Sequence, residues 1–165
     1  MAIGEELLSE FDVEMAKTRK VLERIPADKA AFVPHPKSMS MGKLAAHTAQ
    51  LTGFGLAVLT SSGLDLVPGS FTPLQFESVG QVVKVLDEGA AKVRVALAAT
   101  SDDAWSERWR FAVQGKAIHE DSRYVAYRGA FLNHMIHHRA QLGVYLRLNG
   151  IPVPATYGPT ADEQS

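Results

Sequence analysis

The chain has 165 residues, of which 46% are hydrophobic and 21% charged, and its formal net charge is −1. This length fits one globular domain, which we place at residues 1–165. The small net charge predicts no general attraction to nucleic acid or to anionic lipid. Cysteine is absent, which excludes disulfides, thiolate ligands and a cysteine nucleophile.

The N-terminal sequence lacks the features of a targeting segment. The stretch "MAIGEELLSEFDVEMAK" carries acidic residues where a signal peptide carries basic ones. No apolar run approaches the roughly 20 residues that a membrane span needs. The sequence therefore predicts a cytoplasmic protein with no membrane partner.

Several segments place apolar residues at the three- and four-residue spacing of an amphipathic helix. The first covers residues 3–24 and stops before Pro26. The second follows "HPKSMSMGK", where Ser38 or Ser40 can cap its N-terminus, and it ends at "SSG". The third covers about residues 74–99, after a loop rich in glycine and proline, "GLDLVPGSFTP".

A fourth helix is expected over about residues 122–149, because Gly150 can adopt the left-handed conformation that ends many helices. Before it, residues 101–121 alternate around the Gln-Gly step of "AVQGKA", which indicates either a small hairpin or an extended connection. These elements predict an all-α fold, an antiparallel-type four-helix bundle with a long crossover connection and a possible small hairpin before the last helix. Metal and ligand sites in such bundles lie between the helices.

Three of the six histidines lie in the apolar stretch "FLNHMIHHRAQLGVYLRLNG" of the fourth helix. At about 100° per residue, His134 and His138 lie within roughly 40° of one another and share the inward face of the helix. His137 is turned about 100° from His138, onto a flank. His134 and His138 can therefore bind one metal as neighbours, as in other helical sites with a His-x-x-x-His step.

A third histidine, His47, lies in the middle of the inward face of the second helix. A buried neutral imidazole without partners incurs a desolvation cost of about 1–3 kcal/mol. One metal ion satisfies a nitrogen on each ring, so we predict a metal site formed by His47, His134 and His138. The alternative is that the three rings hydrogen-bond to polar neighbours in the core.

The remaining histidines are weaker candidates for ligands. His35 lies between two prolines before the second helix, and His119 lies beside two acids in the connection. Both are predicted to be surface or structural residues. His137 is the main rival ligand, although its flank position also suits the mouth of the site or a subunit contact.

Two stretches of the chain resemble the DinB family of DinB/YfiT-like proteins. They are "IPADKAAFVPHPKSMSMGKLAAHTAQL" and "NHMIHHRAQLGVYLRLNGIPVPATYGPTADE". The Pro-His-Pro step, the Leu-Ala-Ala-His step, the His-Arg-x-Gln-Leu continuation and the Pro-x-x-Tyr-Gly-Pro tail occur in the order expected for the family. The resemblance implies a four-helix bundle in which His47 takes the ligand position of the second helix and His134 and His138 take the paired positions of the last helix.

The same resemblance implies a divalent metal, nickel or zinc with iron as a further option, and a homodimer. It also implies small-molecule chemistry, because the family includes transferases and isomerases that use low-molecular-weight thiols. Apolar residues outside the main stripe, such as Val144 beside Leu148, agree with a dimer. Three imidazoles suit zinc, nickel, copper and iron alike, so the sequence leaves the metal open.

Three neutral ligands without a carboxylate leave one coordination position of the metal open for water or substrate, as in catalytic sites. A metal at such a site lowers the pKa of a bound water or thiol. A metalloprotease is disfavoured because Asn133 and Met135 flank His134, where that mechanism needs a glutamate. No catalytic residue beyond the ligands is assigned. The candidates for supporting residues are Gln50, Tyr127, Arg128 and Gln141.

Other sequence patterns indicate little about function. "SSGLDLVPGS" lacks the spacing of a phosphate-binding loop and is predicted to be the crossover of the bundle. Trp105 and Trp109 lie among acids, which favours local packing over stacking on bases.

Two functions stay open. One is a metal-dependent enzyme, either a thiol-dependent S-transferase or a related hydrolase or isomerase. The other is a non-catalytic, metal-containing bundle that binds a small molecule or serves in a stress response.

Overall fold

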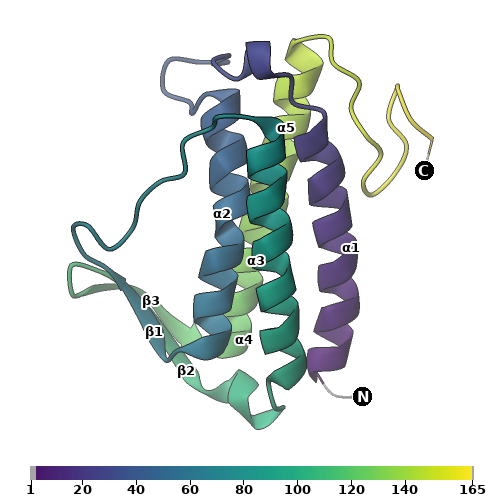
Figure 1. The fold of residues 1–165 in the computed structure, drawn as a ribbon. Coiled ribbons are helices and arrows are strands. Elements are labelled where there is room, and N and C mark those ends of the chain that lie inside the picture. The colour runs from purple at the N-terminus through teal and green to yellow at the C-terminus, as the bar shows by residue number, and fades with distance from the viewer. Residues whose placement is uncertain (1–2, 165) are drawn as a thin grey trace.

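The computed structural model describes residues 3–164 and shows a bundle of helices with a small sheet at one end (Figure 1). The first three long helices are α1 (Ile3–Glu23), α2 (Met41–Thr60) and α3 (Val79–Ala99). The last helix has three consecutive parts, which are α4 (Arg123–Ala126), the π-helical segment η3 (Tyr127–Asn133) and α5 (His134–Leu148). Two short 3-10 turns are η1 (Ala27–Lys29) and η2 (Asp103–Ser106).

The directions of the helices are not those of a simple antiparallel bundle. α1 and the last helix run one way through the bundle, and α2 and α3 run the other way (Figure 1). Because α2 and α3 are parallel neighbours, the chain has to return along the bundle between them, and residues 61–78 do so. The long crossover is therefore confirmed, and the bundle departs from the predicted antiparallel type in that α2 and α3 are parallel.

The sheet has three strands and corrects the all-α prediction. β2 (Arg108–Val113) and β3 (Lys116–Ser122) form the hairpin that the alternation indicated. Gln114 and Gly115 make its turn with φ angles of 50° and 78°. β1 (Gly63–Leu66), in the crossover, pairs with β2 in parallel. The chain is thus mostly helical with a small mixed sheet.

The ends of the helices follow local capping chemistry. Ser40 caps α2 and Ser78 caps α3 through their side-chain oxygens. The third helix consequently starts later than the predicted Leu74, whose amide N–H donates to Gln50 Oε1 instead of joining a helix. Gly150 follows the last helix with a φ of 67°, as expected.

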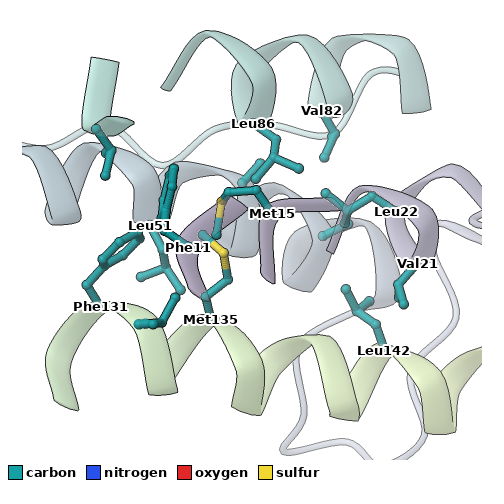
Figure 2. Close-up of a cluster of buried hydrophobic side chains, with 14 of the residues drawn as sticks. Phe11, Met15, Val21, Leu22, Leu51, Val82, Leu86, Phe131, Met135 and Leu142 are labelled. Atoms are coloured by element: carbon teal, nitrogen blue, oxygen red, sulfur yellow. The ribbon is translucent and has the colours of Figure 1, made fainter. Parts of the chain in front are cut away.

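The hydrophobic core lies along the axis of the bundle. Phe11 and Met15 of α1 point toward Phe131 and Met135 of the last helix (Figure 2). The ring centroids of Phe11 and Phe131 are 6.3 Å apart. Aromatic and flexible methionine side chains fill this layer, so the bundle has a core that does not depend on any bound group.

The two tryptophans belong to the core rather than to a binding surface. Trp105 is 2% exposed and Trp109 is fully buried. Their predicted packing role is confirmed, because neither ring is free to stack on a base.

Within residues 3–164, no helix combines the length and apolarity that crossing a membrane requires.

Three glycines lie within α2, where glycine is less stable than alanine by about 0.5–1 kcal/mol. Two of them have a steric reason. A Cβ on Gly42 would lie 3.0 Å from Phe76, and one on Gly55 would lie 2.7 Å from the Phe131 ring. A Cβ on Gly53 would meet nothing within 4 Å. Packing therefore accounts for two of the glycines and leaves Gly53 unexplained.

Candidate metal centre

Three imidazoles converge between α2 and α5. His47 extends from α2, and His134 and His138 extend from successive turns of α5. Nε2 of His134 lies 3.5 Å from Nε2 of His47 and 2.8 Å from Nε2 of His138. The potential ligand atoms of the three residues all lie within 4.8 Å of one another. The structure thus brings together the three histidines that the sequence singled out.

The burial of His47 and His138 favours the neutral form of their rings. His47 and His134 are half-buried, and His138 is 8% exposed. Burial, assisted by the neighbouring rings of His138 and His134, lowers the pKa of His47 to about 4. Burial also lowers the pKa of His138, although the hydrogen bond with Gln141 opposes this shift. At pH 7 both rings are therefore neutral, the form that binds metals.

The nitrogens that face away from the cluster set the orientation of two rings. Nδ1 of His134 lies 3.3 Å from the carbonyl oxygen of Ala130, and Nδ1 of His138 lies 2.7 Å from Oε1 of Gln141. These oxygens are hydrogen-bond acceptors, so they favour the tautomer with the proton on Nδ1, which leaves the lone pair of Nε2 directed into the cluster. Metal-binding histidines have the same arrangement, with the outer N–H donated to an oxygen.

The donor set fits one divalent cation. Lone pairs on nitrogens 2.8 Å apart repel when no proton lies between them, and a cation removes that conflict. Nitrogens that share a metal at about 2.1 Å lie roughly 3.0–3.4 Å from one another. The two Nε2–Nε2 distances of 2.8 and 3.5 Å lie on either side of this range. Among the described residues, the cluster holds three histidines and no carboxylate.

The structure does not bring the other predicted candidates into the cluster. His137 is exposed, and its ring centroid is 5.1 Å from that of His138, but its nitrogens do not join the group. His35 is exposed in the loop before α2, and His119 lies in β3 opposite Phe111. The surface or structural role predicted for His35 and His119 agrees with these positions.

Two of the four predicted supporting residues serve this region. Gln141 bonds a ring of the cluster, and Gln50 lies in the floor of the adjoining cavity. Tyr127 instead packs in a buried aromatic cluster with Trp105 and Phe131. Arg128 pairs with an acid on α1.

The change in helix form beside the cluster was not predicted from the sequence. The π-helical segment η3 ends at Asn133, directly before His134, and it contains Ala130, whose carbonyl faces the His134 ring. Turns of this kind are rare and occur frequently at functional sites. Their signature is a backbone hydrogen-bond pattern, which the apolar spacing of "YRGAFLN" does not reveal.

A cavity of about 670 Å³ adjoins His47 and His134. This volume lies in the range of small-molecule sites. Its floor is α2, and its walls come from β1, the crossover, β2 and α3. Phe71, a wall residue, is 49% exposed, so the cavity reaches solvent. Most of the lining is apolar and includes Leu51, Phe54, Leu64, Leu66, Val85 and Phe111.

The fold and the three convergent histidines define a helical-bundle protein with a candidate metal centre at a cavity. The DinB family model matches residues 1–165. The chain therefore belongs to the DinB family, which confirms the resemblance of the two histidine-containing stretches.

Solved structures share this fold. A DinB-like protein from Bacillus cereus is 18% identical with a TM-score of 0.70, over 94% of this chain and 98% of that chain. A DinB-like protein from Bacillus subtilis is also 18% identical, with a TM-score of 0.67, over 97% and 99%. The mycothiol-dependent maleylpyruvate isomerase is 15% identical with a TM-score of 0.52, over 92% of this chain and 64% of that chain. Likeness at these identities shows the fold alone. No curated protein matches the chain.

Proposed function

We propose that His47, His134 and His138 bind one divalent metal ion, nickel or zinc with iron as a further option. We further propose that the protein is a metal-dependent enzyme that acts on a small molecule with a low-molecular-weight thiol as co-substrate. The convergence of three imidazoles at a cavity that reaches solvent carries this proposal. The fold similarity to an isomerase described as mycothiol-dependent supports it.

The chain's own residues provide the orientation and the surroundings for such a reaction. When bound, the ion supplies a positive charge that lowers the pKa of a coordinated thiol or water. Ala130 and Gln141 hold two of the rings, and the apolar walls provide surface for contact with the apolar parts of a substrate. The chain has no cysteine, so the sulfur nucleophile comes from the co-substrate. In a substitution, sulfur bonds to an electrophilic carbon, the leaving group departs with the bonding electrons, and the thiol proton passes to solvent. In an addition to an alkene or an epoxide, the broken C=C π bond or C–O bond leaves an electron pair on carbon or oxygen, and that atom takes up a proton.

A second candidate function is a metal-containing bundle that binds a small molecule without turnover. The predominance of apolar residues in the cavity lining favours it, because apolar walls bind a molecule without supplying an acid or base. Glu88 is the acidic residue in this lining, and Lys84 pairs with it.

Turnover of small electrophiles is expected to need both the metal and an added thiol. The measurement is product formation from a panel of epoxides, alkyl halides and activated alkenes, with 2-mercaptoethanol as the thiol. The activity should vanish in His134→Ala, which loses the central ring, and persist in His137→Ala. Hydrolysis without thiol would contradict the transferase proposal. Absence of turnover by the metal-loaded protein across the panel would favour the binding bundle.

We also propose that the protein is a homodimer through the outer face of α5. Val144 and Leu148 lie one turn apart on that face and are 58% and 60% exposed. Burying both removes apolar surface from water. Sedimentation equilibrium at micromolar concentration should give a dimer, and Val144→Asp should shift it toward monomer. Val95→Asp on α3, where the residue is 73% exposed, is the matched control and should leave the dimer intact. A monomeric wild type would contradict this prediction.

A further inference from the structure

Packing does not explain why the residue at position 53, on the floor of the cavity, is glycine. It lies in the interior of α2 and lines the cavity, and a Cβ built on it would meet nothing within 4 Å. Alanine would make the helix more stable at no steric cost. The backbone of Gly53 does not need glycine either, since its φ is not positive. The effect of glycine at this position is to keep the floor of the cavity open.

The cavity continues from the histidines along α2 beyond Gly53. His47 lies at one end of its floor and Ala57 at the other, about 15 Å apart at the rise of an α-helix. The facing wall includes Leu64 of β1 and Phe71 of the crossover. The space is thus elongated, with imidazoles at one end and apolar side chains along its length.

The crossover that forms part of this wall is tied to the floor. The side-chain amide of Gln50 donates to the carbonyl oxygen of Thr72 at 3.0 Å, and its Oε1 accepts from the backbone N–H of Leu74 at 2.7 Å. Gln50 lies one helical turn after His47. The wall and the imidazole end are therefore held by the same stretch of α2.

We infer that the cavity binds an elongated, largely apolar small molecule. Its polar group lies at His47 and His134, its apolar body passes over Gly53 beneath the crossover, and Gly53 sets the size of body that fits. This inference rests on the proposed function for the role of the polar end. The apolar body is held by side chains of this chain, whether or not a metal is present.

The test measures binding of 1-anilinonaphthalene-8-sulfonate, a probe with an apolar aromatic body and one sulfonate group, to the protein in the presence of a chelator. Wild type should bind the probe saturably with one site per chain. Gly53→Phe fills the floor and should bind at least about tenfold more weakly. Phe71→Ala removes part of an exposed wall, so it should also weaken binding while leaving the bundle folded.

The matched control is Gly80→Phe in α3. A Cβ there would meet only Ser78 Oγ at 3.9 Å, and the residue lies outside the cavity. Gly80→Phe should bind the probe as wild type does, and thermal unfolding should show that all the variants fold. Equal binding by wild type and Gly53→Phe would overturn the inference, as would the lack of a saturable site in wild type.

A second measurement separates this inference from the proposed metal site. Cobalt-loaded protein is titrated with benzyl mercaptan and with 2-mercaptoethanol, and the change in cobalt absorption is followed. Wild type should prefer the thiol with the apolar body, and Gly53→Phe should lose the preference. Failure to bind cobalt, with specific probe binding retained, would overturn the metal proposal and support the apolar site. Cobalt binding without any preference between the thiols would overturn the inference.

Discussion

His134→Ala is expected to weaken metal binding by more than about 100-fold. Loss of a partner that merely orients a ligand typically costs 10–100-fold in metal affinity, and loss of a ligand removes a bond to the metal. His134 is the central ring of the cluster, because its Nε2 lies close to those of both His47 and His138. The measurement is competition with a chromophoric chelator, together with the metal content of the purified protein.

Two further variants make this prediction specific. His137→Ala should keep the wild-type affinity, because the structure leaves His137 outside the cluster on an exposed position. Gln141→Ala should fall between the two, roughly 10–100-fold weaker than wild type, since it removes the oxygen that orients His138. Full metal content in His134→Ala or His138→Ala would show that these histidines do not form the metal site.

The histidine cluster was predictable because each part of it depends on local periodicity. Helical spacing alone places His134 and His138 on one face and His137 on a flank. The same spacing places His47 on the inward face of α2, and the bundle then leaves few ways for two inward faces to meet. A few turns of a helix are therefore enough to identify its inward face from the sequence.

The features that the sequence did not predict depend on distant partners. β1 is short, and Leu64 pairs with Phe111, a residue that follows the whole of α3. The start of α3 shifts because Leu74 is bonded to Gln50 of α2. The cavity combines side chains from several such elements, so no single stretch of sequence indicates it.

A buried ion pair between α1 and α5 was missed for the same reason. Glu14 lies in the apolar pattern of α1, next to Met15, and Arg139 directly follows His138. Arg139 Nη1 lies 2.7 Å from Glu14 Oε2, and the two side chains are 3% and 5% exposed. Tyr157, in the C-terminal tail, donates its hydroxyl to the same carboxylate at 2.7 Å. The pair therefore joins two helices and the tail.

The charged form of Glu14 is stabilised by its surroundings. Burial raises the pKa of Glu14, but hydrogen bonds from Tyr157 and Arg139, together with the charge of Arg139, outweigh it and hold the pKa below its ordinary value of 4.5. A lowered carboxyl pKa contributes stability that is present above the unfolded-state value and is lost as the pH falls through the folded-state value. We expect this contribution to decline as the pH falls below about 4.5 and to be gone once the pH is below the lowered folded-state pKa.

Glu14→Ala is expected to lower the free energy of unfolding by about 3–5 kcal/mol at pH 7, because it leaves the buried guanidinium of Arg139 without its counter-ion. Urea unfolding followed by circular dichroism measures the effect. Lys17→Ala removes a more exposed partner of Glu14 and should cost no more than about 1 kcal/mol. The double variant Glu14→Met with Arg139→Met should recover most of the loss, since apolar residues of similar volume replace buried ion pairs at little or no cost. A loss below about 1 kcal/mol in Glu14→Ala would show that water or another group compensates the Arg139 charge.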